Sequence, residues 1–468
     1  MGEPPTADLN ELVAALRHEI ACLTRRLDDL SADQGRLVAE NKQLREQLEH
    51  ARKEAARSAA PFRRRDAKKI PLDQQKRPGR PAGHPGLNRP IPNSIDDEVD
   101  VPLTCCPHCQ GAVDHSHSHI QYIEEIPVVR PRVTKLTTHS GTCPKCGPVR
   151  SSHPLQAGRG FHASACQLGP RALALAATLN KQHGLSMRKT CRVLWEACGL
   201  KLSPGGLSQA LDRVADRLEP DYQQLFVDVR AGPAVYVDET SWWVGGPGQW
   251  LWTFTSPTTT LFQVRDARSS AVVLDVLTPE FGGVLVSDCL NSYDAGVPFA
   301  HKHKCIAHHQ KAIREQLDSP GLRDRAYLEA WKGFFRGVCE VWAAWPQMVL
   351  EQRASVRLHF AARREELLTR EVTQTEDVRI RNRLLKQQPY LLTCLEKPDV
   401  VEPTNNRAER ALRPAVIGRK VSCGNKTERG KRTWERIVSV VVTLAQRGRN
   451  VLSELVTRCS LSQPNPVG

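Results

Sequence analysis

Two short apolar runs that each lead into an aspartate constrain the fold of this chain more than any other feature. Residues 234–237 are followed by Asp238 and Glu239, and residues 283–287 are followed by Asp288. Runs of this length and composition are typical of strands buried on both faces of a sheet. We expect the acids to lie just past the ends of these strands, at one edge of one sheet.

The residues between the two runs fit the same sheet. Two β-rich segments, 249–255 and 259–264, are followed by a short helical pattern at 270–277. The order of strand, hairpin strands, helix and strand is the beginning of a ribonuclease-H-like sheet. The sequence therefore predicts a ribonuclease-H-like α/β core that starts near residue 232.

A third acid, Glu409, lies 121 residues after Asp288. It stands in the first turns of a predicted helix that begins at good N-cap residues and that Pro414 is expected to end. Phosphoryl transfer on DNA with two divalent metals needs carboxylates from different elements, so that ions about 3.5–4 Å apart flank the phosphate. Asp238, Asp288 and Glu409 meet this requirement if the fold is as predicted. Taken singly, each could equally be a surface carboxylate or a helix cap.

Four motifs in this part of the chain resemble those of DDE transposases of the insertion sequence 66 family. In chain order they are Val237-Asp238-Glu239-Thr240, Ser287-Asp288 with Tyr293, Cys305-Ile306-Ala307-His308, and residues 405–414 followed by Gly418-Arg419-Lys420. The match departs from the family pattern at residues 309–311, where His-Gln-Lys replaces a small residue and two arginines. Four motifs in this order are far more specific than any one of them.

The resemblance implies an enzyme, a DDE-type transposase of a bacterial insertion sequence, which cuts the ends of its own element and transfers them to target DNA. It implies that Asp238, Asp288 and Glu409 are catalytic and hold two Mg²⁺ or Mn²⁺ ions, which activate first water and then the 3′-hydroxyl. Glu239 is expected to point to the opposite face and to act in support. The sequence leaves open the role of Cys305 and His308.

A helical pattern at 315–399 explains the distance between the second and third acids. It resembles the helical insertion that the family carries before its last catalytic helix. Whether this insertion holds DNA, covers the site or is only structural stays open. After it, the segment 407–432 holds nine Lys and Arg residues and two acids. The basic residues expected there to contact the DNA backbone are Arg410, Arg413, Arg419 and Lys420.

The charge of the whole chain agrees with a nucleic-acid partner. It has 66 Lys and Arg against 51 Asp and Glu, a net charge of +15. We expect double-stranded DNA, both element ends and target, rather than a membrane, because no basic amphipathic segment or lipidation signal is present. No signal peptide or apolar run of about 18 residues occurs, which predicts a cytoplasmic, nucleoid-associated protein. Its 15 cysteines are then expected to be metal ligands or reduced core residues.

The first fifty residues carry a strict heptad repeat. Leucines recur every seven residues from Leu9 to Leu44, at the d positions of the repeat. The a positions, four residues after each leucine, are mostly aliphatic. Such a pattern favours a parallel two-stranded coiled coil, in which the polar Asn41 fixes the register. The alternative is an amphipathic helix packed on its own chain. The sequence thus predicts a homodimer.

A basic linker follows the heptads. The window 52–92 holds 12 Lys and Arg and three acids among many Pro, Gly and Ala residues, so it cannot bury a core. Its centre resembles the family's glycine-proline linker and a minor-groove hook, in which Arg77 and Arg80 contact DNA. A solvated spacer that meets phosphates without preference is the equal alternative.

Two CxxC pairs predict structural zinc. Cys106 and Cys109 form the first pair and Cys143 and Cys146 the second, and each pair places two thiolates on one tight loop. The alternating segments 121–129 and 132–139 suit a hairpin that joins them, which makes a zinc ribbon. Possible substitute ligands are Cys105, His115, His117 and His119, although a plain loop is the favoured interpretation of these residues.

Residues 166–230 read as helices, and the short break near Gly199 makes a helix-turn-helix candidate for DNA binding or a plain packing unit. The predicted division of the whole chain is as follows: a coiled coil (1–50), a basic linker (51–95), a zinc ribbon (96–165), a helix-turn-helix-like domain (166–230), the first part of the core (231–314), the helical insertion (315–399) and the last part of the core with basic C-terminal helices (400–468).

Two other functions remain possible from sequence. One is a DNA-binding regulator or domesticated transposase without chemistry, against which the three intact acids argue. The other is a ribonuclease-H-class nuclease or resolvase that never joins strands. Inverted repeats beside the coding region favour the transposase. The sequence does not give the terminal repeat, the target preference or the need for accessory proteins of the same element.

Overall fold

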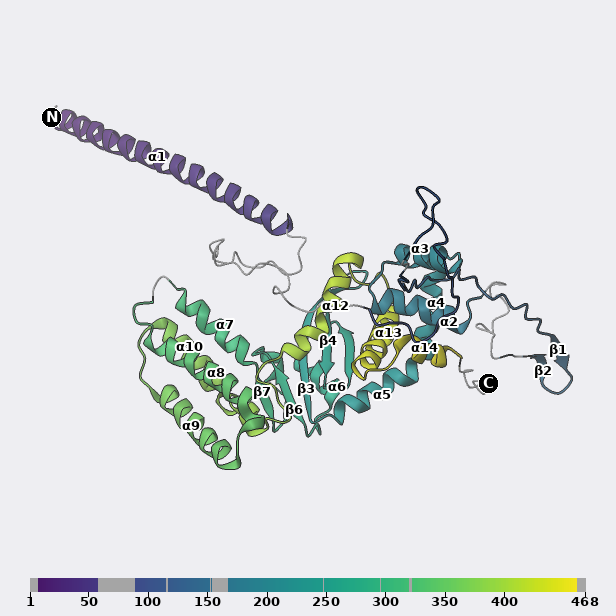
Figure 1. The fold of residues 1–468 in the computed structure, drawn as a ribbon. Coiled ribbons are helices and arrows are strands. Elements are labelled where there is room, and N and C mark those ends of the chain that lie inside the picture. The colour runs from purple at the N-terminus through teal and green to yellow at the C-terminus, as the bar shows by residue number, and fades with distance from the viewer. Residues whose placement is uncertain are drawn as a thin grey trace. The chain divides into compact units, whose positions relative to one another are not determined.

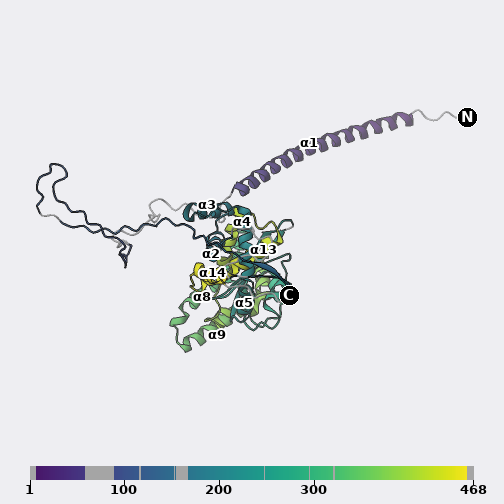
Figure 2. The same ribbon diagram turned by 90° about the vertical axis from the view of Figure 1, so that its right-hand side faces the viewer.

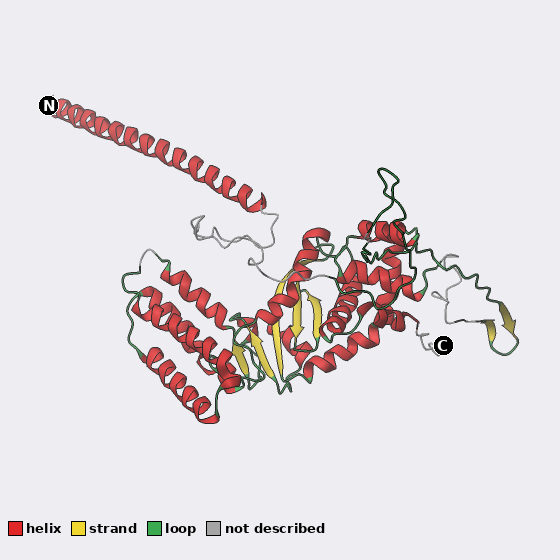
Figure 3. Cartoon of the chain, viewed as in Figure 1, coloured by secondary structure: helices red, strands yellow, loops and turns green. Residues whose placement is uncertain are grey.

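The structure, a computed structural model, describes residues 7–57, 89–114, 117–151, 153, 167–246, 248–294, 296–319 and 322–460. The chain forms two compact units, Met1–Asp100 and Val101–Gly468, and each is described here by itself. The fold is mixed α/β (Figure 1; Figure 3). Arg77, Arg80 and His115 lie outside the described residues. Among the described helices, none is both long and apolar enough to cross a membrane.

The first unit contains one long helix, α1 (Ala7–Arg57), which is uninterrupted in both ribbon views (Figure 2). Its heptad stripe is exposed: the relative exposure of Leu23 is 57%, of Leu30 66% and of Leu37 64%. Side chains of this kind are normally buried when a helix packs on its own chain. Among the described residues of this unit, nothing covers the stripe.

The second unit is built on a five-stranded mixed sheet with strand order β5-β4-β3-β6-β7. The strands are β3 (Ala234–Trp243), β4 (Gly248–Thr255), β5 (Thr260–Arg265), β6 (Val284–Ser287) and β7 (Lys302–Lys304). The first three form an antiparallel meander, and β6 and β7 run parallel to β3. Helix α6 (Ser270–Leu277) joins β5 to β6, so the strands and the helix expected from the sequence between the two aspartates are all present.

Strand β3 is longer than expected. The sequence predicted an end just before Asp238, but the strand continues to Trp243 because it pairs with β4 as far as Gly248. On its other side, the pairing with β6 stops at Tyr236 and Val286. Asp238 therefore lies inside a strand, yet beside the end of its shorter parallel neighbour.

Helices cover both faces of the sheet. On one face, Val235 and Val237 of β3 and Leu285 of β6 belong to a core shared with the N-terminal and C-terminal helices. These helices are α2 (Pro170–Ala177), its π-helical extension η2 (Thr178–Gln182), α3 (Met187–Cys198), α4 (Pro204–Arg217), α5 (Glu219–Arg230), α13 (Glu428–Gln446) and α14 (Val451–Ser460). The helical region 166–230 thus shares its core with the sheet.

On the other face, Tyr236 and Val286 belong to a second core shared with the helix that follows β7 and with the predicted insertion. Figure 1 shows its helices grouped beside β7. They are α7 (Ile306–Leu317), α8 (Ala326–Ala344), the 3₁₀ turn η4 (Trp345–Gln347), α9 (Leu350–Thr369), α10 (Thr375–Gln387), η5 (Gln388–Tyr390) and α11 (Thr393–Glu396). The helical character expected for residues 315–399 is present.

Helix α12 (Asn406–Ser422) passes through Pro414, so the expectation that this proline ends the helix was wrong. A proline inside a helix removes one backbone hydrogen bond and strains the preceding turn. Here Leu412 and Ala415, on either side of it, are buried in a third core with Trp242 of β3 and Val438 of α13. Tertiary packing therefore outweighs the local cost.

The region of the CxxC pairs has little regular structure. Its described strands are β1 (Ser140–Cys143) and β2 (Gly147–Arg150), which form a hairpin around the second pair. The hairpin expected from residues 121–139 is not formed, and this expectation was wrong. An alternating pattern stabilises a hairpin when one face is buried, but Ile123 and Val133 are 89% and 88% exposed.

Candidate active site

Parallel pairing of β3 and β6 places two aspartates in one row. Tyr236 of β3 is paired with Val286 of β6. Asp238 lies two residues after Tyr236 in β3, and Asp288 lies two residues after Val286, just past the end of β6. Because side chains alternate along a strand, the two aspartates continue the same face. The predicted meeting of the two aspartates at one sheet edge therefore agrees with the register.

Helix α12 brings Glu409 to this edge through Asn405, a fully buried residue. The Asn405 side chain does not cap the helix. Its Nδ2 donates a hydrogen bond of 2.8 Å to the carbonyl of Val237, one residue before Asp238. Its backbone N–H donates to Cys305 Sγ, with 3.1 Å between N and S. Asn405 thus ties α12 to β3 and to the end of β7, a role that its reading as a helix cap missed.

The surroundings of Asp238 shift the pKa of its carboxyl group. Burial raises its pKa to about 7, and the carboxylates of Glu239, Asp288 and Glu409 add to the rise. Asp238 accepts a hydrogen bond of 3.0 Å from the backbone N–H of Glu239, and Asp288 accepts one of 2.8 Å from Leu290. Carboxylates that oppose one another's ionisation are the arrangement that a bound divalent cation stabilises.

Asp238→Asn is expected to stabilise the metal-free protein at high pH. An acid whose pKa is higher folded (about 7) than unfolded (about 3.9) binds its proton more tightly when folded. Its contribution to stability is therefore full below pH about 4 and is lost as the pH rises to about 7. Asparagine avoids this loss, so the variant should gain about 2 kcal/mol more at pH 8 than at pH 5.

The measurement is denaturant unfolding of both proteins in EDTA at the two pH values. Added Mg²⁺ should stabilise the natural chain more than the variant and narrow the difference. An equal gain at pH 5 and pH 8 would show that the carboxyl does not titrate in this range.

Glu239 points to the opposite face of β3, as expected. Its side chain is 1% exposed and forms an ion pair of 2.6 Å with Arg268, whose guanidinium lies 4.6 Å from the centre of the Trp250 ring. The Tyr293 hydroxyl donates to the other carboxylate oxygen. Tyr293 belongs to the turn η3 (Asn291–Tyr293) that follows Asp288. This network links β3 to the loop that carries the second aspartate.

A buried lysine fixes the same loop. Lys304 of β7 is fully buried, and its Nζ lies 2.7 Å from Asp294 and 3.2 Å from the carbonyl oxygen of Asp288. From the insertion, Gln387 donates to Asp294 over 2.8 Å and Lys386 to Asn291 over 2.9 Å. The insertion helix α10 therefore supports the loop after Asp288.

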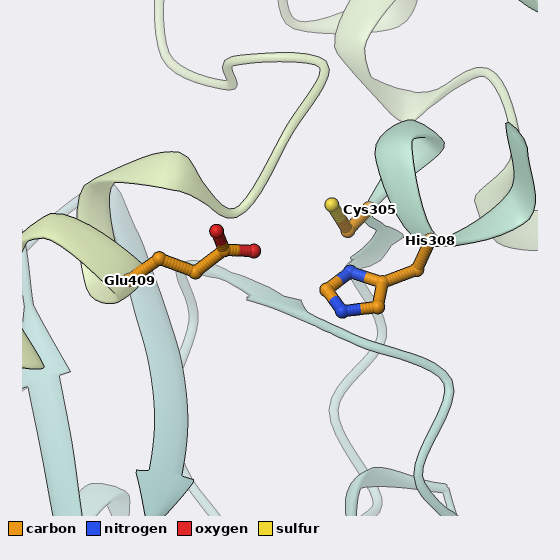
Figure 4. A group of neighbouring side chains, drawn as sticks. All are labelled: Cys305, His308 and Glu409. Atoms are coloured by element: carbon orange, nitrogen blue, oxygen red, sulfur yellow. The ribbon is translucent and has the colours of Figure 1, made fainter. Parts of the chain in front are cut away.

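Two side chains at the start of α7 meet the third acid. Cys305 at the N-cap of α7, His308 in its first turn and Glu409 of α12 have potential metal-ligand atoms within 4.8 Å of one another. Figure 4 shows the His308 ring and the Cys305 thiol on one side and the Glu409 carboxylate opposite them. Burial raises the pKa of the Cys305 thiol to about 11.

Two further histidines of this segment, His303 and His309, are structural. Burial lowers the pKa of His303 to about 4, and its Nε2 lies 3.1 Å from the carbonyl oxygen of Pro403. His309 stacks on Phe335 with ring centres 5.3 Å apart, and burial lowers its pKa as well. Both rings are therefore neutral packing groups.

The comparison with known families agrees with this geometry. The model of the family described as "Transposase IS66 family" matches residues 165–433, more than half of the chain, and this range contains all three acids. This chain belongs to the transposase IS66 family. The resemblance carried by the four motifs is thereby confirmed, and family membership implies a DNA-processing enzyme that uses divalent metal. No curated protein matches the chain.

The family match includes the basic residues of α12, which differ in their surroundings. Arg410, Arg413 and Lys420 are exposed. Arg419 instead donates hydrogen bonds of 3.2 Å to Thr240 and 3.0 Å to the Ser241 hydroxyl on β3. Arg419 therefore anchors α12 to the sheet in this structure.

The two CxxC loops resemble each other in detail. Backbone N–H groups of Cys109 and His108 lower the pKa of the Cys106 thiol, and those of Cys146 and Lys145 lower that of Cys143. The residue after the second cysteine has a positive φ in both loops, 61° at Gln110 and 75° at Gly147. The two loops thus have the same local conformation, but the structure does not bring the two pairs together: the cluster of three described ligands noted above includes none of the four cysteines.

The helix-turn-helix candidate is formed by α3 and α4, with Gly199 in the left-handed conformation between them. One face of α4 is buried, and on it Asp212 forms an ion pair of 2.7 Å with Arg429 of α13. Helix α3 presents its basic residues to solvent, and Trp195 beside them is 54% exposed. The exposed helix of the pair is thus the first one.

Proposed function

We propose that this chain is a DNA transposase that cuts at the ends of its mobile element and joins them to target DNA, with Asp238, Asp288 and Glu409 as catalytic acids. The observation that carries the proposal is their common position. The register of β3 and β6 aligns the two aspartates, and Glu409 lies near enough for its charge to raise the pKa of Asp238. Family membership supports the same reaction class.

The core is proposed to be ribonuclease-H-like. Supporting this are the strand order β5-β4-β3-β6-β7, the antiparallel meander and the two parallel strands that follow. The helices α8 to α11 are then an insertion before the last catalytic helix, α12.

The acids fit two Mg²⁺ or Mn²⁺ ions. These hard cations prefer carboxylate oxygens. Burial and the neighbouring carboxylates raise the pKa of Asp238 to about 7, so a bound cation would stabilise its ionised form. Such ions, when bound, would supply an activated nucleophile and neutralise charge on the phosphate.

The protein's own contribution is to hold the acids in place. Asn405 fixes α12 against β3, Arg268 and Tyr293 hold Glu239 away from the acid row, and Lys304 anchors the loop of Asp288. A rigid site of this kind pre-organises charge where the phosphate reacts. Cleavage then leaves a 3′-hydroxyl at the element end, and the attack of this group on target DNA displaces a target 3′-oxygen.

Contacts with DNA are proposed for the exposed basic residues beside the site, in particular Arg410, Arg413 and Lys420. They follow Glu409 on α12 at helical spacing, so a strand held at the acids passes along them. Arg419, Arg77 and Arg80 remain proposals from the sequence, as do the boundaries of the seven regions and the need for accessory proteins.

Structural zinc at Cys106, Cys109, Cys143 and Cys146 is the proposed cofactor of the region 96–165. Two thiolate pairs on similar loops complete a tetrahedral site when they share one ion. That ion would join the two loops into the zinc ribbon, although the pairs lie apart here.

Cys143→Ser is expected to lower the zinc bound by the purified chain by about one ion, because the four thiolates act together. Cys106→Ser should have the same effect, and Cys105→Ser, the neighbouring cysteine outside the pairs, serves as control. Metal analysis after purification without added zinc gives the count. A zinc content equal to that of the natural chain in either pair variant would contradict a site shared by the two loops.

The proposed function is tested with the purified full chain, Mg²⁺ and DNA that carries the terminal repeats of the element. We expect cuts at the repeat tips that leave 3′-hydroxyl ends, followed by joining of these ends to a second duplex. Cutting without joining would indicate a nuclease or resolvase. Binding of the repeats without cutting would indicate a regulator.

A further inference from the structure

We propose that Cys305, His308 and Glu409 form a second metal site, selective for a thiophilic divalent ion such as Zn²⁺, beside the catalytic acids. Occupation of this site withdraws Glu409 from the Mg²⁺ site and so inhibits cleavage. The inhibition rests on the proposed function, whereas the binding of metal does not.

The position of the thiol is fixed by the sheet. The backbone N–H of Cys305 donates to the carbonyl of Ser287 over 2.9 Å, one residue before Asp288. Cys305 therefore directly follows the end of β7, beside the row of aspartates. Its sulfur also accepts a hydrogen bond from the backbone N–H of Asn405, the N-cap residue of α12. This bond links the thiol to the helix that carries Glu409.

The histidine is free to take a metal. His308 Nδ1 is buried and has no hydrogen-bond partner among the described residues. A buried polar atom normally has such a partner. The i, i+3 spacing of Cys305 and His308 at the start of α7 directs both side chains to one side of the helix, and Figure 4 shows the ring beside the thiol and facing Glu409.

The separation of the ligand atoms suits zinc after a small movement. Bonds of about 2.0–2.3 Å in a tetrahedral zinc site place ligand atoms about 3.3–3.8 Å apart. The three atoms here lie within 4.8 Å of one another, so a closure of about 1 Å brings them to bonding distance. Glu409 is exposed, and its side chain can make this movement without disturbing the core.

The chemistry of the ligands sets the choice of ion. Sulfur and imidazole nitrogen favour Zn²⁺ and related transition metals, whereas Mg²⁺ prefers oxygen ligands. When the ion binds, the Cys305 thiol loses its proton to solvent and its sulfur bonds to the metal. Three protein ligands leave a fourth position for water or a DNA oxygen. Since Glu409 serves both sites, the two metals compete for it.

The binding test uses Co²⁺ as a spectroscopic probe on the full chain, to which only about one equivalent of Zn²⁺ has first been added to fill the four-thiolate site of the CxxC loops. We expect one further Co²⁺ ion per chain, with thiolate-to-metal charge-transfer absorbance. Cys305→Ala and His308→Ala should lower the affinity for Co²⁺. The loss should be at least roughly 10–100-fold, which is what removal of a residue that only supports a ligand costs. Cys394→Ala, a buried cysteine of the insertion core, is the matched control and should bind as the natural chain does.

Identical Co²⁺ titrations of the natural chain and Cys305→Ala would overturn the site. The inhibition is measured separately, as the Zn²⁺ concentration that halves Mg²⁺-dependent cleavage, each protein being normalised to its own rate without zinc. Cys305→Ala should need at least about tenfold more Zn²⁺. Equal sensitivity would overturn the competition. If the natural chain cuts no DNA, the proposed function fails, and the Co²⁺ titration still decides the metal site.

Discussion

Asp288→Asn is expected to lower Mg²⁺-dependent cleavage at the element ends by at least 10³-fold, which corresponds to about 4 kcal/mol of transition-state stabilisation. Asparagine keeps the size and one oxygen of the side chain but removes the charge that a divalent cation needs. The register of β3 and β6 places Asp288 beside Asp238, so its carboxylate is expected to bind the same ions. Asp238→Asn should have an effect of similar size.

The measurement is a single-turnover cleavage assay on DNA with the terminal repeats, together with binding of the same DNA in the absence of cleavage. Binding by Asp288→Asn should stay close to that of the natural chain, since phosphate contacts come from basic residues. Asp318→Asn, an exposed acid at the end of α7, is the control. If Asp288→Asn cut within tenfold of the natural rate, the acid row would not be the catalytic centre.

The second large effect is expected in α1. Leu23→Ala combined with Leu30→Ala should weaken dimerisation by at least 10³-fold, or about 4 kcal/mol. These two leucines lie on the exposed heptad stripe. In a dimer that buries this stripe, the double variant removes four buried leucine side chains, two from each chain. Each truncation of a buried leucine costs about 2–5 kcal/mol, so the expected loss is a lower limit.

Sedimentation over a range of protein concentrations measures this change. The double variant Arg25→Ala and Asp28→Ala, outside the heptad stripe of the same helix, is the matched control and should dimerise normally. The monomeric variant should still nick single ends but form no paired-end products, because two chains are needed to hold two ends. Paired-end products from a monomeric chain would contradict the role of the coiled coil.

Much of the local structure followed from short-range patterns. The apolar runs before Asp238 and Asp288 became β3 and β6, and the helical pattern between them became α6 at the expected residues. Strand and helix periods act over a few residues, which is why a single sequence displays them. The errors arose where tertiary contacts decide: β4 extends β3 beyond Asp238, and packing on Trp242 carries α12 through Pro414.

The site divides in the same way. That both aspartates share one face could be read from two equal strand positions once parallel pairing is assumed. The role of Asn405 could not, because its amide bonds to Val237, 168 residues earlier in the chain. The convergence of Cys305 and His308 on Glu409 likewise carries no local signal beyond the presence of the motifs.

The sequence by itself determined the three acids, the motifs of the family, the order of the strands and the heptad repeat, because each is a composition or spacing within a short segment. Only the tertiary structure decided that the helical region 166–230 shares the core of the sheet, that the insertion supports the loop of Asp288, and that a thiol and an imidazole adjoin Glu409. These features depend on packing between segments that are separate in the chain. Such packing is set by the shape and burial of the whole fold and not by any local pattern.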